Sequence, residues 1–131
     1  MITVRDAVEA DLPAIIDIYN QSIPSGLSTA DTHPISVEER RPWFRQFSPK
    51  KRPIWVAERA GKIVGYIYIT SFYGGRPAYD KTAEVSLYLA PKAQRQGLGT
   101  DLMQRMIDAC PQLGVTTLIG MHFDHNEATK R

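Results

Sequence analysis

The chain has a single cysteine among its 131 residues, which excludes an internal disulfide framework and is typical of proteins from a reducing compartment. No apolar run approaches membrane-spanning length, and the amino-terminal residues contain no apolar signal core. Charge of one sign is also scarce: 16 Lys and Arg against 14 Asp and Glu give a net charge of +2, too little to favour nucleic acid as a partner. We therefore expect one cytoplasmic domain with a single core.

Metal ligands are equally scarce. His33, His122 and His125 share no ligand spacing with one another or with Cys110. Cys110 falls on an apolar helical stripe, where a buried, inert thiol is expected rather than a reactive nucleophile. The sequence thus predicts no metal site and favours chemistry without a covalent cysteine intermediate.

The most informative stretch runs from Thr82 to Ile107 and is typical of a strand, a short basic loop and a helix. Residues alternate along the strand, with one face apolar, formed by Ala83, Val85, Leu87 and Leu89. The opposite face is formed by Thr82, Glu84, Ser86 and Tyr88. Apolar residues then recur at helical spacing, at Leu98, Leu102, Met106 and Ala109, with Met103, Ile107 and Cys110 widening the stripe.

The loop between strand and helix has the pattern Q-x-x-G-x-G, formed by Gln94, Arg95, Gln96, Gly97, Leu98 and Gly99. Glycines let the backbone turn its N–H groups outward, and the following helix adds unpaired donors and the positive end of its dipole. These features predict a seat for a diphosphate on the amides from Arg95 to Thr100. Taken alone, the loop is equally compatible with a tight turn that has a solvated basic rim.

Periodicity predicts the remaining elements. Further strands are expected at 1–5, 54–58, 62–71 and 115–121, with a hairpin at 59–61. Three helices are expected: one within 6–20, one that begins at the capping box Ser36–Glu39, and one from 124 onward. The first should begin no earlier than Glu9, because Pro13 is tolerated only in the first turn of a helix. Pro42 predicts a kink or break in the second helix, and Gly65 predicts a bulge or a close approach. Trp43, Phe44 and Trp55 are expected in the core, and the alternative for Trp43 and Phe44 is the wall of a pocket.

The chain resembles the Gcn5-related N-acetyltransferase (GNAT) superfamily, and within it the phosphinothricin and methionine sulfoximine acetyltransferase branch. The resemblance covers essentially the whole chain and is carried by 18–20, 30–32, 72–79, 82–89, 94–99 and His125-Asn126. It implies an α/β fold with a mixed central sheet and helices on both faces, acetyl-CoA as cosubstrate, a small amino-acid-like amine as acceptor, and a homodimer. Family members run on for a further helix and strand pair, so a general acid for the leaving thiolate is expected beyond Arg131.

The resemblance also implies roles for individual residues. Glu84 corresponds to the general base, which takes the proton of the acceptor amine directly or through a water. Main-chain groups of Leu87, Tyr88 and Leu89 are expected to hold the pantetheine arm, with the Leu89 N–H facing the acetyl oxygen. Asn126 corresponds to a second contact with that arm. The acceptor would be bound by Arg76 and Tyr79, whose segment lies over the substrate in the family, together with Thr32 and Tyr73.

Plainer interpretations stay open for these residues. Glu84 could be a half-exposed strand glutamate paired with Lys81 or Arg76, Arg76 a surface residue in a turn, and Asn126 a helix cap. The chain as a whole could be an acyl-CoA-binding module without catalysis, or an acetyltransferase for a different amine.

Overall fold

The computed structural model describes residues 2–22, 36–71, 81–93 and 97–120. Within them, five strands form one sheet in the order β1-β2-β3-β4-β5. The strands are β1 (Ile2–Asp6), β2 (Ile54–Arg59), β3 (Lys62–Ser71), β4 (Thr82–Leu89) and β5 (Thr117–Gly120). Neighbours from β1 to β4 pair antiparallel, whereas β5 pairs parallel to β4. The mixed central sheet predicted from the resemblance is confirmed.

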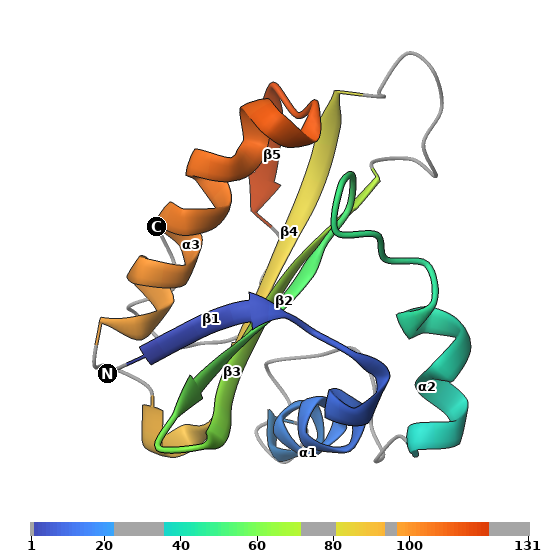
Figure 1. Cartoon of the computed structure of the whole chain (residues 1–131), viewed down its shortest axis with the longest axis vertical. Helices are drawn as coiled ribbons and strands as arrows, with labels where there is room; N and C mark the ends of the chain where they lie inside the picture. Colours follow the sequence, from blue (N-terminus) through green and yellow to red (C-terminus); the bar gives the residue numbers. More distant parts are fainter. Residues whose placement is uncertain (1, 23–35, 72–80, 94–96, 121–131) are drawn as a thin grey trace.

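Helices cover both faces of this sheet (Figure 1). On one face lie α1 (Leu12–Ser22), entered through the 3₁₀ turn Glu9–Asp11, and α2 (Val37–Phe44). On the other lies α3 (Leu98–Ala109), the crossover from β4 to the parallel strand β5. Two buried clusters result, one between the sheet and α3 and one between the sheet, α1 and α2. Strand β4 contributes to both clusters, because its two faces meet different helices.

The predicted alternation along β4 is confirmed on its apolar face. All four apolar residues, Ala83, Val85, Leu87 and Leu89, are buried in the cluster that packs against α3. The opposite face is less polar than predicted, since Tyr88 is also buried, in the cluster that includes α1 residues. Glu84 and Ser86 are half-buried between these extremes.

The structure corrects several predicted details. Ile107 was expected on the buried stripe of α3 but is 47% exposed, because Leu98, Leu102 and Met106 already fill the line of contact with the sheet. Helix α2 begins at the predicted capping box, continues through Pro42, where a kink or break was predicted, and ends two residues later at Phe44. Strand β5 begins at Thr117 rather than at 115, because the Val115 N–H donates to the Cys110 carbonyl and closes the turn after α3.

Gly65 shows both features that its place in a strand predicted. The register between β2 and β3 shifts beside it, from the pair Ala57 and Gly65 to the pair Glu58 and Ile63, which leaves Val64 as the bulged residue. A Cβ on Gly65 would lie 2.7 Å from Leu89 Cδ2 and 3.1 Å from the Tyr88 carbonyl oxygen. This close approach places the β3 backbone directly against the end of β4.

We expect Gly65→Ala to lower the free energy of unfolding by about 1–2 kcal/mol, because the added methyl overpacks a closed site. Leu89 can shift its side chain, but the Tyr88 carbonyl belongs to the backbone of the sheet and cannot move without disturbing it. Urea unfolding of the purified variant measures the change. Unaltered stability would show that β3 and β4 lie further apart than the structure has them.

Candidate active site

Glu84 lies in the middle of the sheet on β4, opposite Thr70 of β3 and Ile119 of β5. It is half-buried, and its side chain is on the face covered by α1 and α2. Among the described residues it forms no ion pair, so the alternative pairing with Lys81 is not present, while Arg76 lies outside the described residues. A carboxylate without a cationic partner is available to accept a proton from a bound amine.

The face that carries Glu84 is lined by aromatic rings. They belong to Tyr19, Trp43, Phe47, Tyr66, Tyr68 and Tyr88. The Tyr66 and Tyr88 rings stack with centroids 5.1 Å apart, and Trp43 meets Tyr68 edge-on at 5.2 Å. We call this group the aromatic cluster. Trp43 packs against Phe47 and Tyr68 in this cluster, a position that fits both a core residue and a pocket wall.

Two phenols of the aromatic cluster are held neutral by their surroundings. Burial raises the pKa of Tyr66 well above its usual value. Burial likewise raises the pKa of Tyr68, against the opposing effects of a side-chain hydrogen bond with Ser86 and the positive charge of Arg40. Tyr68 also feels the negative charge of Glu84, which lies on the same face of β4, two residues from the Ser86 that is opposite Tyr68. The site therefore offers neutral hydroxyl groups beside one carboxylate.

Sequence reasoning treated these aromatic residues individually and missed the cluster. The signal was available, because Tyr66 and Tyr68 are two residues apart in one predicted strand and Tyr88 shares a face with Glu84 in the other. What the sequence lacked was the register, in which Tyr66 is opposite Tyr88 and Tyr68 is opposite Ser86.

Strand β4 extends beyond its described pairing with β5. The last described pair joins Val85 to Gly120, whereas β4 continues as far as Leu89. Along its other edge, β4 stays paired with β3 up to the pair of Gly65 and Leu89. The segment Leu87 to Leu89, predicted to contact the pantetheine arm, is thus the part of β4 that lies past its described contacts with β5.

The described part of the predicted glycine loop is its end, from Gly97 into the amino terminus of α3. Gly97 precedes the helix with φ of 82°, in the left-handed region that favours glycine, and nothing lies within 4 Å of where its Cβ would be. The first helical hydrogen bond runs from the Asp101 N–H to the Gly97 carbonyl, so the N–H groups of Leu98, Gly99 and Thr100 have no acceptor within the helix. These donors and the helix dipole suit a diphosphate.

The other predicted site residues lie outside the described residues. They are Thr32, Tyr73, Arg76, Tyr79, Gln94, Arg95, Gln96 and Asn126. The structure therefore places Glu84 and the segment Leu87 to Leu89 on one strand, β4, and the start of α3 on the opposite side of the sheet, and leaves the acceptor-binding segment as a prediction.

Cys110 is buried, as predicted. Its Sγ donates to the Met106 carbonyl at 3.3 Å, and burial raises the pKa of its thiol. A protonated thiol in this position is a poor nucleophile. Within the described residues, no three His, Cys, Asp or Glu side chains are grouped to hold a metal ion, and no helix is long and apolar enough to cross a bilayer.

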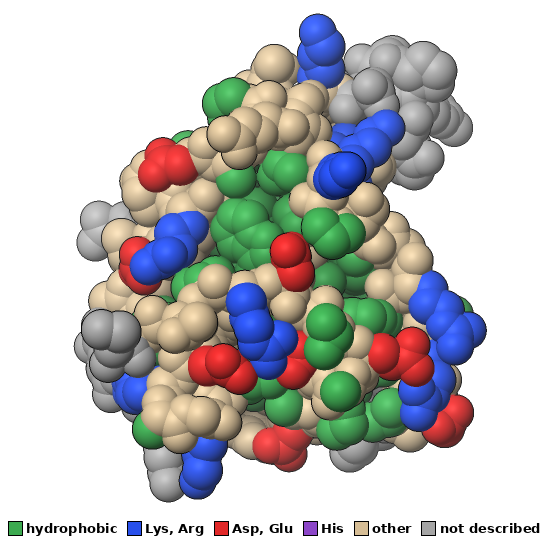
Figure 2. All heavy atoms as spheres, viewed as in Figure 1, with side chains coloured by type: hydrophobic (Ala, Val, Ile, Leu, Met, Phe, Trp, Pro, Cys, Tyr) green, Lys and Arg blue, Asp and Glu red, His purple; other side chains and the backbone are tan. Residues whose placement is uncertain are grey.

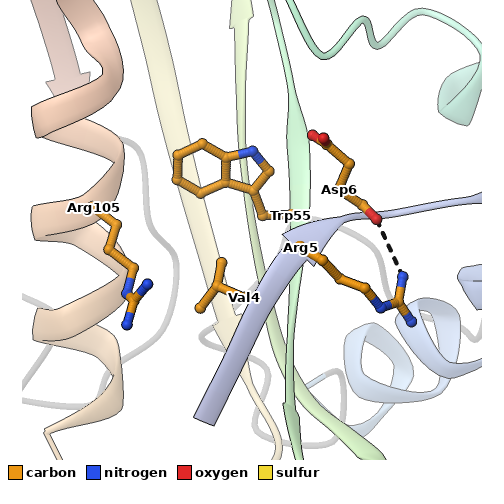
Figure 3. Close-up of a pocket in the computed structure, with 5 residues that line it drawn as sticks. All are labelled: Val4, Arg5, Asp6, Trp55 and Arg105. Carbon is orange, nitrogen blue, oxygen red and sulfur yellow. Dashed lines mark hydrogen bonds between the residues drawn. The ribbon is translucent and has the colours of Figure 1, made fainter.

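A shallow pocket of about 270 Å³ lies on the opposite face, between α3 and the first two strands (Figure 3). It is lined by Val4, Arg5, Asp6, Trp55 and Arg105. Figure 2 shows hydrophobic side chains at the bottom of this hollow, and Trp55, predicted as core, is only half-buried here. Its two arginines are engaged elsewhere, Arg5 with Asp11 and Glu58 and Arg105 with Asp101. The pocket is not next to Glu84 and contributes nothing to the candidate active site.

Comparison with known proteins agrees with this fold. Residues 12–131 match the acetyltransferase (GNAT) family. The Bacillus subtilis protein YwnH is 41% identical over 126 residues, covering 95% of this chain and 76% of its own length. A phosphinothricin N-acetyltransferase from Streptomyces coelicolor is 34% identical, over 82% of this chain and 64% of that protein.

A solved structure is also similar. The phosphinothricin acetyltransferase from Sinorhizobium meliloti, determined in complex with acetyl-CoA, superposes with a TM-score of 0.75 at 35% identity, covering 83% of this chain and 59% of that one. This chain thus spans between about three fifths and three quarters of the length of these relatives. Family match and fold agree: the chain belongs to the GNAT family of acetyltransferases, whose acetyl donor is acetyl-CoA.

Proposed function

We propose that the chain acetylates the amino group of a small amino-acid-like acceptor of the phosphinothricin, methionine sulfoximine or methionine sulfone type, by direct attack with Glu84 as general base. The observation that carries the proposal is the position of Glu84: half-buried on β4, without an ionic partner among the described residues, and beside the aromatic cluster. Phosphinothricin is the acceptor that the names of the relatives above contain, whereas methionine sulfoximine and methionine sulfone come from the family resemblance, so the acceptor class rests on similarity alone.

Glu84 and the Leu89 N–H would act at different steps of the reaction. An alkylammonium has a pKa of about 10, so the amine must lose a proton before it can attack, and Glu84 would take it directly or through a water. When bound, acetyl-CoA supplies an activated acetyl thioester, whose C–S bond breaks as the C–N bond forms. The Leu89 N–H would face the acetyl oxygen as negative charge develops there. The leaving thiolate, with a pKa of about 8.5, takes up a proton to yield free CoA.

The coenzyme would be positioned from the start of α3. The amides of Leu98, Gly99 and Thr100 point to a diphosphate seat, which Gln94, Arg95, Gln96 and Gly97 would complete. Leu87, Tyr88 and Leu89, past the last described pair of β4 with β5, would contact the pantetheine arm, with Asn126 as a further contact. Arg76, Tyr79, Thr32 and Tyr73 remain our candidates for binding the acceptor.

Release of free CoA tests the proposal. Purified protein with acetyl-CoA and a panel of amino acids should release thiol with phosphinothricin, methionine sulfoximine or methionine sulfone, and much less with lysine or an aminoglycoside. The N-acetyl product, identified by mass spectrometry, distinguishes transfer from thioester hydrolysis. Acetyl-CoA binding without turnover of any amine would favour the non-catalytic module instead. Turnover confined to other amines would show that the chain is an acetyltransferase with a different acceptor class.

The family resemblance further leads us to propose a cytoplasmic homodimer. Light scattering coupled to size-exclusion chromatography measures the mass in solution, and a value near that of one chain would contradict the dimer.

A further inference from the structure

Arg40 on α2 is held against two aromatic rings on the face of the sheet that carries Glu84. Its guanidinium carbon is 4.8 Å from the ring centroid of Trp43 and 5.1 Å from that of Tyr19, which are cation–π distances. Trp43 lies on the same helix and Tyr19 on α1, so the guanidinium bridges the two helices above the aromatic cluster. The side chain is half-buried rather than extended into solvent.

The carboxylates near Arg40 on its own helix are engaged with other groups. Glu38 pairs with Arg41, which also binds Glu9, and Glu39 accepts the Ser36 N–H in the capping box. Among the described residues, no carboxylate forms an ion pair with Arg40. A cation–π contact is satisfied by ring electron density, so the five N–H donors of this guanidinium have no described carboxylate to bind.

The charge of Arg40 reaches the residues around the candidate base. It acts on Tyr66 and Tyr68, in both cases opposing the rise in pKa that burial causes. Tyr68 in turn interacts with Glu84 and shares a hydrogen bond with Ser86. The half-buried Tyr68 ring meets that of Trp43 at 5.2 Å and lies opposite Ser86, two residues from Glu84 on the same face of β4. Arg40 and Glu84 therefore act on the same phenol from α2 and from β4.

We propose that Arg40 is a specificity-determining residue of the acceptor site, which binds an anionic group at the distal end of the acceptor side chain while Glu84 meets the amine. This inference rests on the function proposed above. Guanidinium matches carboxylate, phosphinate and phosphonate oxygens with paired N–H donors, and a half-buried position strengthens such a contact relative to the surface. The aromatic cluster would pack against the methylene groups between the two ends of the acceptor.

The alternative role is a structural tie between α1 and α2, and the two roles differ in what they predict for different acceptors. A tie affects every acceptor alike through the stability or shape of the site. A binding residue affects acceptors with a distal anion and spares those without one. Phosphinothricin, with a charged phosphinate, and methionine sulfone, with a neutral sulfone, form a suitable pair of probes.

We expect Arg40→Met to raise KM for phosphinothricin by about tenfold or more, the loss of roughly one charge-assisted contact. KM for methionine sulfone and for acetyl-CoA should change by less than about threefold on the same reasoning. Arg40→Lys should recover part of the loss, because it keeps the charge but not the paired donors. Arg45→Met is the matched control: it removes the same charge next to α2 from an exposed position and should leave all three KM values unchanged.

Equal increases in KM for phosphinothricin and methionine sulfone would show that Arg40 only holds α1 and α2 together, and would overturn the inference. Unchanged kinetics in Arg40→Met would overturn it as well. If the methionine variant does not fold, Arg40→Gln takes its place, with the thermal midpoint measured alongside. A wild-type protein that acetylates neither amine overturns the proposed function and this inference together, whereas active wild type with an unselective variant overturns the inference alone.

Discussion

Glu84→Gln lowers kcat by about 10²–10⁴-fold if this carboxylate is the general base, the range typical for removing a positioned proton acceptor. Glutamine has nearly the same shape and can occupy the same place on β4, but it cannot accept the ammonium proton. Affinity for acetyl-CoA should stay the same, because Glu84 is not among the groups proposed to bind it. Rates of CoA release and calorimetric binding of acetyl-CoA, measured on the same protein, separate the two effects.

Glu58→Gln provides the matched comparison for this variant. Glu58 is also a half-buried strand glutamate, but it lies on β2 and pairs with Arg5. Glu58→Gln should lower the free energy of unfolding only modestly, because it breaks a partly exposed ion pair, and should leave kcat unchanged. Raising the pH should restore part of the activity of Glu84→Gln, because more of the amine then arrives unprotonated. A Glu84→Gln enzyme with wild-type kcat would remove Glu84 from the mechanism.

Sequence reasoning predicted the elements that local patterns specify. The alternation from Thr82 to Leu89 gave the bounds of β4, since one face had to be apolar against α3. Gly97 marked the start of α3, because a left-handed turn is most readily made by glycine. The capping box at Ser36 and Glu39 gave the start of α2, through the two reciprocal hydrogen bonds that the structure contains.

Features that depend on contacts between distant segments of the chain could not be predicted from local patterns. Ile107 fits the helical stripe as well as Met106 does, and only the packing of Leu98, Leu102 and Met106 against the sheet leaves it exposed. The position of Arg40 depends on α1 and α2 lying side by side, so that Tyr19 and Trp43 are both within reach. Neither residue differs from an ordinary helical residue until the tertiary structure is known.

Two glycines make it possible to separate the binding of the coenzyme diphosphate at the start of α3 from the loss of stability that a strained backbone causes. Gly97 and Gly114 both have positive φ, 82° and 76°, and nothing lies within 4 Å of the Cβ that either would carry. Gly97 precedes α3, whereas Gly114 caps the turn that follows it. Valine at either place must adopt a left-handed conformation, at a cost of about 2 kcal/mol in the free energy of unfolding.

Only Gly97→Val should also weaken the binding of acetyl-CoA, by about ten- to hundredfold, because strain at the residue before α3 turns the amides of Leu98 and Gly99 away from the diphosphate. Gly114→Val shares the backbone cost at the opposite end of the helix and should bind acetyl-CoA as the wild type does. Calorimetric titration, with urea unfolding of both variants, measures the two effects. If both valine variants bind acetyl-CoA equally well, the start of α3 does not hold the diphosphate, because the strain is the same in both and only the position differs.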